Sequence, residues 1–454
     1  MLSEKIDYYL AQIVQNRYPQ YSIRLKKELI CLSVLITACL VVYWPVFTHE
    51  FQLGWDDHWV VINLFTESGF TRENLIHVLT IFYHGQYAPM NELFYMTVYS
   101  ISGYNPSWFH AASLMVHISN VLLTFFFLLK LLRQSQSFEE GRTLRIAFIC
   151  SLLMAVHPFL VESVAWLSAS KTLVYAFFYL LAMHAYLHYL KTLKAKYYIA
   201  TLLLFILSFG GKEQAVTMMM CLLLIDYALK RNFRERAIWL EKIPFFVLTI
   251  FFIIVTFKSQ AINGEGVLSG QKLYPFYQNV VYSFYTLAEY LIKCELPIRL
   301  SYIYPFPNLQ GEPLPLHLWL YPIAIIMAAI GFWSFWKKPW ITFGIAFFII
   351  HISTALNLVP TSRFAIVADR YVYLASIGIF FILAYLLDDL ITNKPKYKYA
   401  VWAIFLTYFL SLGAYANERC KIWHDSDTLK AEIHIIIKNR PDYEYYKKKL
   451  KLDL

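Results

Sequence analysis

The sequence predicts an all-α polytopic membrane protein, with about 11 transmembrane helices and further interfacial helices at the outer face. Two observations predict this fold class. Of the 454 residues, 59% are hydrophobic and only 15% are charged, whereas soluble domains carry about 25% charged residues. The apolar residues also gather into long runs, several of them near the roughly 20 residues that cross a bilayer.

The runs follow one another along most of the chain. Residues 1–28 are polar and basic, and we expect them to form a cytoplasmic amphipathic N-terminus. Residues 29–416 hold the expected membrane spans, which lie near 29–47, 108–132, 145–160, 172–190, 197–210, 214–230, 240–257, 316–336, 340–357, 371–390 and 399–416. The stretch 276–296 contains three charged residues, and it could be a twelfth span or a helix in the membrane interface.

The distribution of basic residues decides between these two topologies. With 11 spans, the segments expected inside carry 22 Lys and Arg residues and the outer loops carry 9. This bias follows the positive-inside rule and places the N-terminus in and the C-terminus out. It also accounts for the net charge of +10 without a nucleic-acid partner. The outer loops are 48–107 and 258–315. The first is too long to be a plain connector, and we expect short helices along the membrane in it.

Two adjacent acids follow the first apolar run. Asp56 and Asp57 stand in the sequence Trp55–His58, just beyond the expected first span. Carboxylates beside a membrane span are costly in hydrocarbon and useful where they face a reactant. The alternative is an interfacial tryptophan with two solvated acids.

Three later breaks between apolar runs carry charged residues on the same expected outer face. In 157–166, Glu162 could hold a metal, orient a donor, cap the next helix or pair with Lys171. In 210–214, two glycines allow a sharp turn, and Lys212 could bind a lipid phosphate or extend to the interface. Arg370 opens the tenth span, and with Arg363 it forms an outer cationic patch suited to phosphate.

Six motifs in the same order resemble those of a known family. They are the acidic pair, G-x-N-P-x-x-x-H (103–110), H-P-x-x-V-E-S-V-A-W (157–166) with a following Lys, K-E-Q (212–214) leading to L-x-D-Y (224–227), A-D-R-Y-x-Y-L-x-S-I-G (368–378) and W-x-D-S-x-T-L (423–429). Together they cover about residues 50–430 and resemble bacterial relatives of the TMTC-type O-mannosyltransferases, which are GT-C superfamily glycosyltransferases. Members of that family commonly continue into TPR repeats. Here the outer-face tail 417–454 resembles at most the start of one repeat, too little for a stable solenoid.

The resemblance implies a GT-C-like catalytic domain over 29–416. Such enzymes move a sugar, mannose in the family's name, from a polyprenyl-phosphate donor to an acceptor hydroxyl, often of protein Ser or Thr, with inversion. The implied site would face the periplasm from a bacterial inner membrane. Carried onto this sequence, the implied base is Asp56 or Asp57, with Asp56 slightly favoured, and Glu162 is a second acidic residue. The implied ligands of the donor phosphate are Lys171, Lys212, Arg370 and Arg363, and the implied substrate contacts are His58, His157 and Glu213.

The sequence leaves alternatives for the cofactor and for the function. A divalent cation, Mg²⁺ or Mn²⁺, could bind at Asp56, Asp57 and Glu162. The enzyme could instead be an oligosaccharyltransferase, or it could act on a lipid or a cell-envelope polymer. From a different class, a transporter or flippase for a lipid-linked glycan is the alternative, although such proteins usually show internal repeats and charges at the membrane midplane.

Overall fold

The chain folds almost entirely into helices. The computed structural model describes residues 19–261, 274–309, 311–358 and 365–450. Within these ranges the only sheet is a short antiparallel pair, β1 (Tyr304–Pro305) with β2 (Ala365–Val367). The prediction of an all-α protein is therefore confirmed for the described part of the chain. Arg363 lies outside it.

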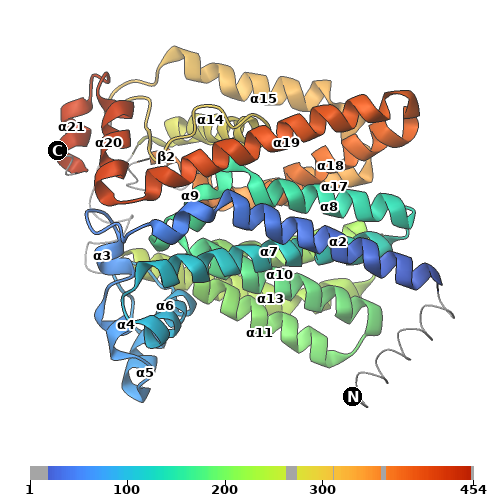
Figure 1. The fold of residues 1–454 in the computed structure, drawn as a ribbon, viewed down its shortest axis with the longest axis horizontal. Coiled ribbons are helices and arrows are strands. Elements are labelled where there is room, and N and C mark those ends of the chain that lie inside the picture. The colour runs from blue at the N-terminus through green and yellow to red at the C-terminus, as the bar shows by residue number, and fades with distance from the viewer. Residues whose placement is uncertain (1–18, 262–273, 310, 359–364, 451–454) are drawn as a thin grey trace.

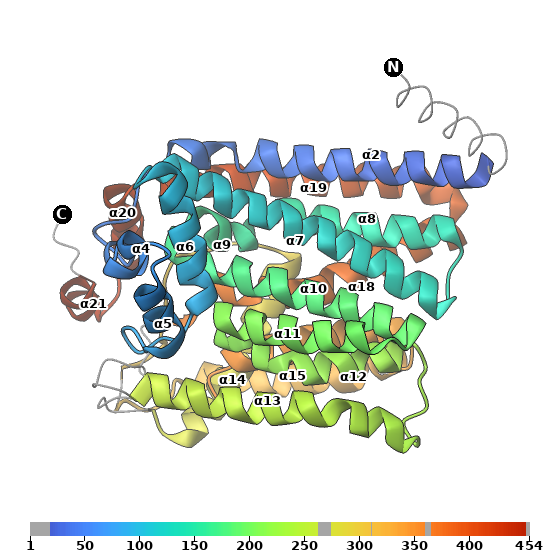
Figure 2. The same cartoon turned by 90° about the horizontal axis from the view of Figure 1, so that it is seen from below.

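Twelve of the described helices have more than ten residues and lie in the body of the molecule. Most of them run side by side along its long axis (Figures 1 and 2). In chain order they are α2 (Pro19–Val42), α7 (Pro106–Ser135), α8 (Glu140–Val156), α10 (Lys171–Thr192), α11 (Ala195–Gly211), α12 (Met218–Ala228), α13 (Arg236–Ala261), α14 (Phe276–Glu295), α15 (Leu320–Gly331), α17 (Pro339–Ile352), α18 (Ser376–Asn393) and α19 (Lys398–Cys420).

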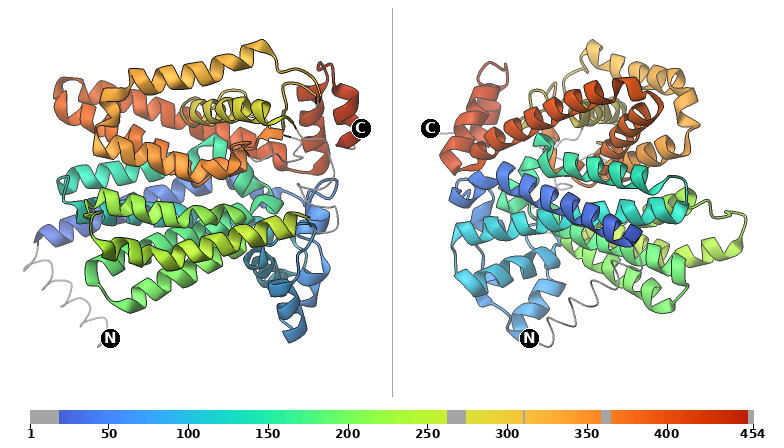
Figure 3. Two further views of the ribbon diagram at one scale, coloured as in Figure 1. Left: turned by 180° about the vertical axis from the view of Figure 1, so that it is seen from behind. Right: turned by 45° about the vertical axis from the view of Figure 1, so that its right-hand side comes forward.

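Six further helices of at most 14 residues, called the short helices below, gather at one end of this bundle. They are α3 (Asp57–Val60), α4 (Leu64–Ser68), α5 (Arg72–Thr80), α6 (Pro89–Ser102), α20 (Ser426–Ile437) and α21 (Tyr443–Lys449). Figure 3 shows α3 to α6 at the same end as α20 and α21, and Figure 1 shows α2 beginning at the opposite end. The segment 48–107 thus contains short helices, as we expected. The tail forms a two-helix hairpin packed onto the body of the protein, with buried Leu429 and Ile433 in the main core.

Helix length and composition do not confirm the predicted number of membrane-spanning helices. In the described ranges, five helical stretches are long and apolar enough to cross a membrane: 106–135, 167–192, 236–261, 376–393 and 395–423. A sixth would join α8 to residues 158–165 across a bend of 59°. The prediction of 11 is not confirmed. One reason is that the expected span 214–230 breaks into a 3₁₀ turn and the 11-residue α12.

The connections that carry most basic residues share one end of the bundle. The links α7–α8, α10–α11, α12–α13 and α18–α19 all lie opposite the short helices (Figure 2). The charged breaks singled out in the sequence lie at the other end. The described helices therefore separate basic anchors from the candidate site, as the charge distribution predicted.

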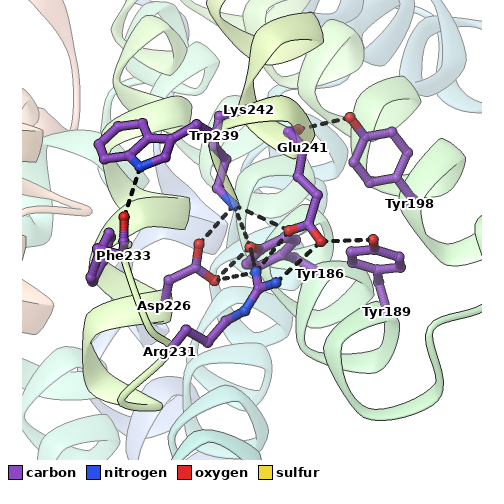
Figure 4. Close-up of polar contacts among 9 residues, drawn as sticks. All are labelled: Tyr186, Tyr189, Tyr198, Asp226, Arg231, Phe233, Trp239, Glu241 and Lys242. Atoms are coloured by element: carbon purple, nitrogen blue, oxygen red, sulfur yellow. Dashed lines mark hydrogen bonds and ion pairs between the residues drawn. The ribbon is translucent and has the colours of Figure 1, made fainter. Parts of the chain in front are cut away.

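A buried ion-pair network joins α10, α12 and α13 at the basic end (Figure 4). Asp226 at the end of α12 pairs with Lys242 of α13 at 2.7 Å and with Arg231 at 3.1 Å. Arg231 also pairs with Glu241 at 2.7 Å, and Tyr186 of α10 donates to Asp226 at 2.6 Å. Because these charges satisfy one another, the Asp of the L-x-D-Y motif is explained by helix packing far from the candidate site.

Glycine allows α17 and α18 to approach closely. A Cβ atom added at Gly378 would lie 2.3 Å from the carbonyl oxygen of Gly344 and 2.7 Å from the amide nitrogen of Phe348. Real Cβ atoms essentially never approach so closely. Small residues at helix interfaces in membranes let backbones pack against each other. The last glycine of the A-D-R-Y motif is therefore required by packing.

Candidate functional site

The candidate site is built around a buried break between α8 and α10. Residues 157–170 form η2 (Pro158–Leu160), α9 (Val161–Ala165) and η3 (Leu167–Ala169), and every one of them is buried. Pro158 cannot continue the ladder of α8, so the chain turns here. The hydroxyl of Tyr95 on α6 supports the break, since it donates to the Leu167 carbonyl at 2.7 Å. The break thus brings Glu162 and Ser168 into the interior.

Asp57 fastens the loop after α2 to this break. Its carboxylate is fully buried and accepts from the Gln52 amide at 2.8 Å and the Ser168 amide at 3.0 Å. The Ser168 hydroxyl donates to it as well. Burial raises the pKa of Asp57 to about 6, and these hydrogen bonds hold back the rise. Both carboxylate oxygens are therefore occupied by groups of the protein itself.

Asp56, unlike Asp57, is not buried and remains partly accessible. It precedes α3 but makes no capping hydrogen bond, and it is partly exposed. Among the described residues, its carboxylate has no ion-pair partner. Its charge raises the pKa of Tyr302, which burial already places well above the ordinary value. Glu162 raises the same pKa and Arg370 lowers it, so Asp56, Glu162 and Arg370 all lie close to one tyrosine.

Aromatic rings surround that tyrosine. The Tyr302 ring lies 5.3 Å from Trp55, 5.6 Å from Trp166 and 5.0 Å from Trp423, measured between ring centroids. Trp166 and Trp423 stack at 5.3 Å. These rings come from four distant parts of the sequence. They form one aromatic cluster, and Asp56 directly follows Trp55, one of its members.

Glu162 and Arg370 form an ion pair at the centre of the site. Arg370 Nη1 lies 2.5 Å from Glu162 Oε1, and the guanidinium lies over Trp166 and Tyr371 at 5.3 and 5.1 Å. The second oxygen of Glu162, Oε2, is buried without a hydrogen-bond partner among the described residues. Arg370 is about a quarter exposed. One carboxylate oxygen and part of one guanidinium thus stay available to a ligand.

A second buried ion pair holds Arg370 in place. Asp369 begins η8 (Asp369–Val372) and pairs with Arg419 of α19 at 2.6 Å. The Tyr304 hydroxyl donates to Asp369 at 2.7 Å. Burial raises the pKa of Asp369 to about 7, and Arg419 holds that rise back. This pair fixes η8 to α19 and so sets the position of Arg370.

Lys212 lies between α11 and η4 (Glu213–Thr217) and is almost fully buried. Its Nζ donates to the Thr172 hydroxyl at 2.9 Å and lies 4.7 Å from the centre of the Tyr371 ring. Burial lowers the pKa of Lys212; Glu213 and Glu162 raise it, while Lys171 and Arg370 lower it further. Lys212 and Arg370 thus both lie against the Tyr371 ring, close enough to Glu162 to respond to its charge.

Lys171 faces an open pocket beside these residues. The pocket lies among α3, α5 and α6, and Gln86, Glu92 and Trp59 also line it. Lys171 Nζ donates to Gln86 Oε1 at 2.7 Å. Burial raises the pKa of Glu92 to about 7, and Lys171 opposes the rise. The alternative Glu162–Lys171 pair is not formed: Glu162 pairs with Arg370, and Lys171 donates to Gln86 instead.

Most of the predicted residues that the structure describes lie together, and His58 and His157 are the two exceptions. Glu213 lies beside Lys212, as its effect on the lysine pKa shows. His58 is exposed on α3, and its Nδ1 contacts the Trp55 carbonyl. His157 is buried at the start of η2, where Nδ1 accepts from the Phe159 amide and the ring packs on Phe380 at 4.9 Å. These contacts give His157 a structural place at the break.

The tail supports the loop that carries the acidic pair. Gln52 Nε2 donates to the Trp423 carbonyl at 2.9 Å, and the Gly54 amide donates to the Ser426 hydroxyl at 2.9 Å. Trp423 and Ser426 belong to the W-x-D-S motif. Sequence reasoning missed this role, and it also missed Tyr302, Asp369 and Arg419 as parts of the site. Asp369 stands inside a quoted motif, whereas no pattern marked Tyr302.

The described carboxylates do not form a three-ligand metal site. Among the described residues, no group of three or more His, Cys, Asp or Glu side chains is arranged to hold a metal ion. Asp57 is occupied by Gln52 and Ser168. Asp56 and the free oxygen of Glu162 are the oxygen ligands that remain, and Mg²⁺ and Mn²⁺ commonly complete their coordination with water.

Comparisons with known proteins give one group of structural neighbours. No family model and no curated protein sequence matches this chain. A crystal structure of the Archaeoglobus fulgidus oligosaccharyltransferase tethered with an acceptor peptide is 17% identical, with a TM-score of 0.44 over 93% of this chain and 59% of that one. The archaeal oligosaccharyltransferase AglB from the same organism, with an inhibitory peptide and a dolichol-phosphate, is 15% identical, with a TM-score of 0.45 over 93% and 60%. This chain thus spans about 60% of the length of those proteins.

Proposed function

We propose that this integral membrane protein is an inverting glycosyltransferase of the GT-C type. It takes a sugar from a polyprenyl-phosphate donor and transfers it to an acceptor hydroxyl at the bundle end that carries the short helices. The observation that carries the proposal is the arrangement around Tyr302. An accessible carboxylate, Asp56, lies there with a partly free guanidinium, Arg370, at one end of an apolar bundle.

Asp56 acts as the general base in this proposal. A serine or threonine hydroxyl is a weak nucleophile, so a carboxylate within hydrogen-bond reach takes its proton as the oxygen attacks C1 of the sugar. The bond from C1 to the phosphate oxygen breaks, and its electron pair leaves with the polyprenyl phosphate. A single displacement inverts C1 and requires one base. Asp57 is a positioning residue, because its oxygens already hold Gln52 and Ser168.

Arg370 and Lys212 hold the donor phosphate. The leaving group is a phosphate, so it requires charge stabilisation more than protonation. Arg370 offers a planar fork for two phosphate oxygens, and Lys212 offers a compact charge. A bound phosphate near Lys212 would offset the burial that lowers its pKa, and so keep the lysine protonated. Lys171, at the adjacent pocket, extends the same cationic surface.

Whether a divalent cation takes part in the transfer is a separate question for experiment. If one binds, Asp56 and Glu162 Oε2 would hold it, and it would supply charge stabilisation to the leaving phosphate. The residue roles above do not depend on it. EDTA treatment followed by Mg²⁺ or Mn²⁺ addition separates the two cases: recovery of transfer on metal addition supports a cation, and full activity in EDTA excludes one.

The class of function is tested by sugar transfer in a defined membrane. Purified protein in liposomes receives a radiolabelled polyprenyl-phosphate sugar and acceptors of three kinds: a Ser/Thr peptide, a lipid and an envelope polymer. We expect the acceptor to become labelled, and the peptide more than the lipid or the polymer. Mannose is the first sugar to test. Movement of the donor between leaflets without any transfer would support the transporter alternative, and transfer of a whole oligosaccharide would support the oligosaccharyltransferase alternative.

A further inference from the structure

A cavity lies at the basic end of the bundle, far from the candidate site. It opens between the last turns of α7 and α10, with a volume of about 290 Å³. A single water requires about 10–15 Å³ of such volume, so this cavity has room for a headgroup. Phe126 and Leu129 form its apolar part, and Phe126 is exposed on the surface of the bundle.

The polar lining of the cavity is cationic. Lys130, Arg133 and Lys191 line it together with His184 and His188, and the lining contains no Asp or Glu. Arg133 is already neutralised, because it pairs with Glu28 at 2.5 Å and also with Glu140. Two lysines of like charge therefore remain without a carboxylate among the described residues.

The Lys130 ammonium is partly satisfied by neutral groups. Its Nζ donates to the His184 carbonyl and to His188 Nδ1, both at 3.0 Å. An ammonium has three donors, so one is left for a ligand. Lys191 is exposed at the rim. Two cations facing one cavity repel each other, and an anion between them removes that cost.

We infer that this cavity binds the phosphate headgroup of an anionic phospholipid of the membrane. The headgroup phosphate lies between Lys130 and Lys191, and an acyl chain lies along Phe126. Basic pockets between transmembrane helices on the cytoplasmic side are sites for such headgroups. The cavity shares its end with the basic connections, which the positive-inside rule places in the cytoplasm. The inference does not depend on the proposed glycosyl transfer.

Native mass spectrometry of the full-length protein tests this site. We would titrate phosphatidylglycerol and, separately, phosphatidylcholine with the same acyl chains. The variant K130Q/K191Q removes both cations. K194Q/K196Q removes two exposed lysines, one in the α10–α11 link and one in the first turn of α11, as a charge-matched control. A cation near an anionic lipid surface contributes about 1 kcal/mol, so we expect phosphatidylglycerol to bind the first variant about 30-fold more weakly. The control should change less than about 3-fold.

Two further measurements test the site even if K130Q/K191Q folds poorly. The variant K130R/K191R keeps the charge and should keep the phosphatidylglycerol affinity. Raising the salt concentration should weaken binding of phosphatidylglycerol to the wild type and leave phosphatidylcholine unchanged. Equal binding of the two lipids, an equal loss in the control, or binding of a polyprenyl phosphate but not of phosphatidylglycerol would each overturn the inference.

Discussion

Replacing Arg419 by Met is the sharpest test of how the site is held together. Arg419 is 3% exposed and its partner Asp369 is 0% exposed, with 2.6 Å between the paired atoms. Methionine keeps most of the apolar stem and removes the charge. The buried Asp369 carboxylate is then left with the Tyr304 hydroxyl. Breaking a buried pair in this way costs about 3–5 kcal/mol, because a charge remains without compensation.

The loss should depend on pH in a defined direction. Burial raises the folded-state pKa of Asp369 to about 7, above the ordinary value of about 3.9. Without Arg419 this pKa rises further. A carboxyl whose folded pKa is raised contributes stability at low pH that is lost as pH rises through the folded pKa. The variant should therefore be least impaired near pH 5 and most impaired near pH 8.

Thermal unfolding in one detergent at pH 5 and pH 8 measures both effects. The double variant D369N/R419M carries no unpaired buried charge, so we expect it to recover at least half of the loss at pH 8. The reasoning is refuted if R419M matches the wild type at pH 8, if its deficit is larger at pH 5, or if the double variant is no better than the single one.

Two further predictions concern packing and a second buried acid. Asp57 has a folded pKa of about 6, so its share of the free energy of unfolding should fall by ~3 kcal/mol as pH rises from about 4 to about 6. D57N should remove that part of the pH dependence, and an unchanged slope would contradict the assignment. G378A should lower the free energy of unfolding by about 1–3 kcal/mol, because the added Cβ meets the Gly344 carbonyl. G141A, where the nearest atom is a flexible Arg145 nitrogen at 3.5 Å, should be neutral or slightly stabilising, and equal losses in the two glycine variants would refute the packing argument.

The breaks between apolar runs could be found from the sequence because hydropathy shows where a chain leaves a helix. Glu162, Lys212 and Arg370 all stand at such breaks, and all three meet near Tyr371. The number of spans was less predictable. Hydropathy alone does not tell a full crossing from a short buried helix such as α12.

The separate roles of Asp56 and Asp57 could not be read from the sequence. Successive residues at the start of a helix point about 100° apart, so the two carboxylates face different surroundings. Which one turns inward depends on Ser168, which lies 111 residues further along the chain. Arg419 pairs with a residue 50 positions away, and Tyr302 contacts aromatic rings from three other segments. Such contacts are products of tertiary packing and leave no local pattern.

The most direct test of the proposed function compares Asp56→Asn with the wild type in a single turnover. The same labelled polyprenyl-phosphate sugar is used to measure donor binding and transfer to an acceptor hydroxyl. We predict an unchanged Kd for the donor and a loss of about 10²–10⁴-fold in the transfer rate, with helical content and thermal unfolding as in the wild type. Transfer by Asp56→Asn at the wild-type rate would contradict the assignment of Asp56 as the base.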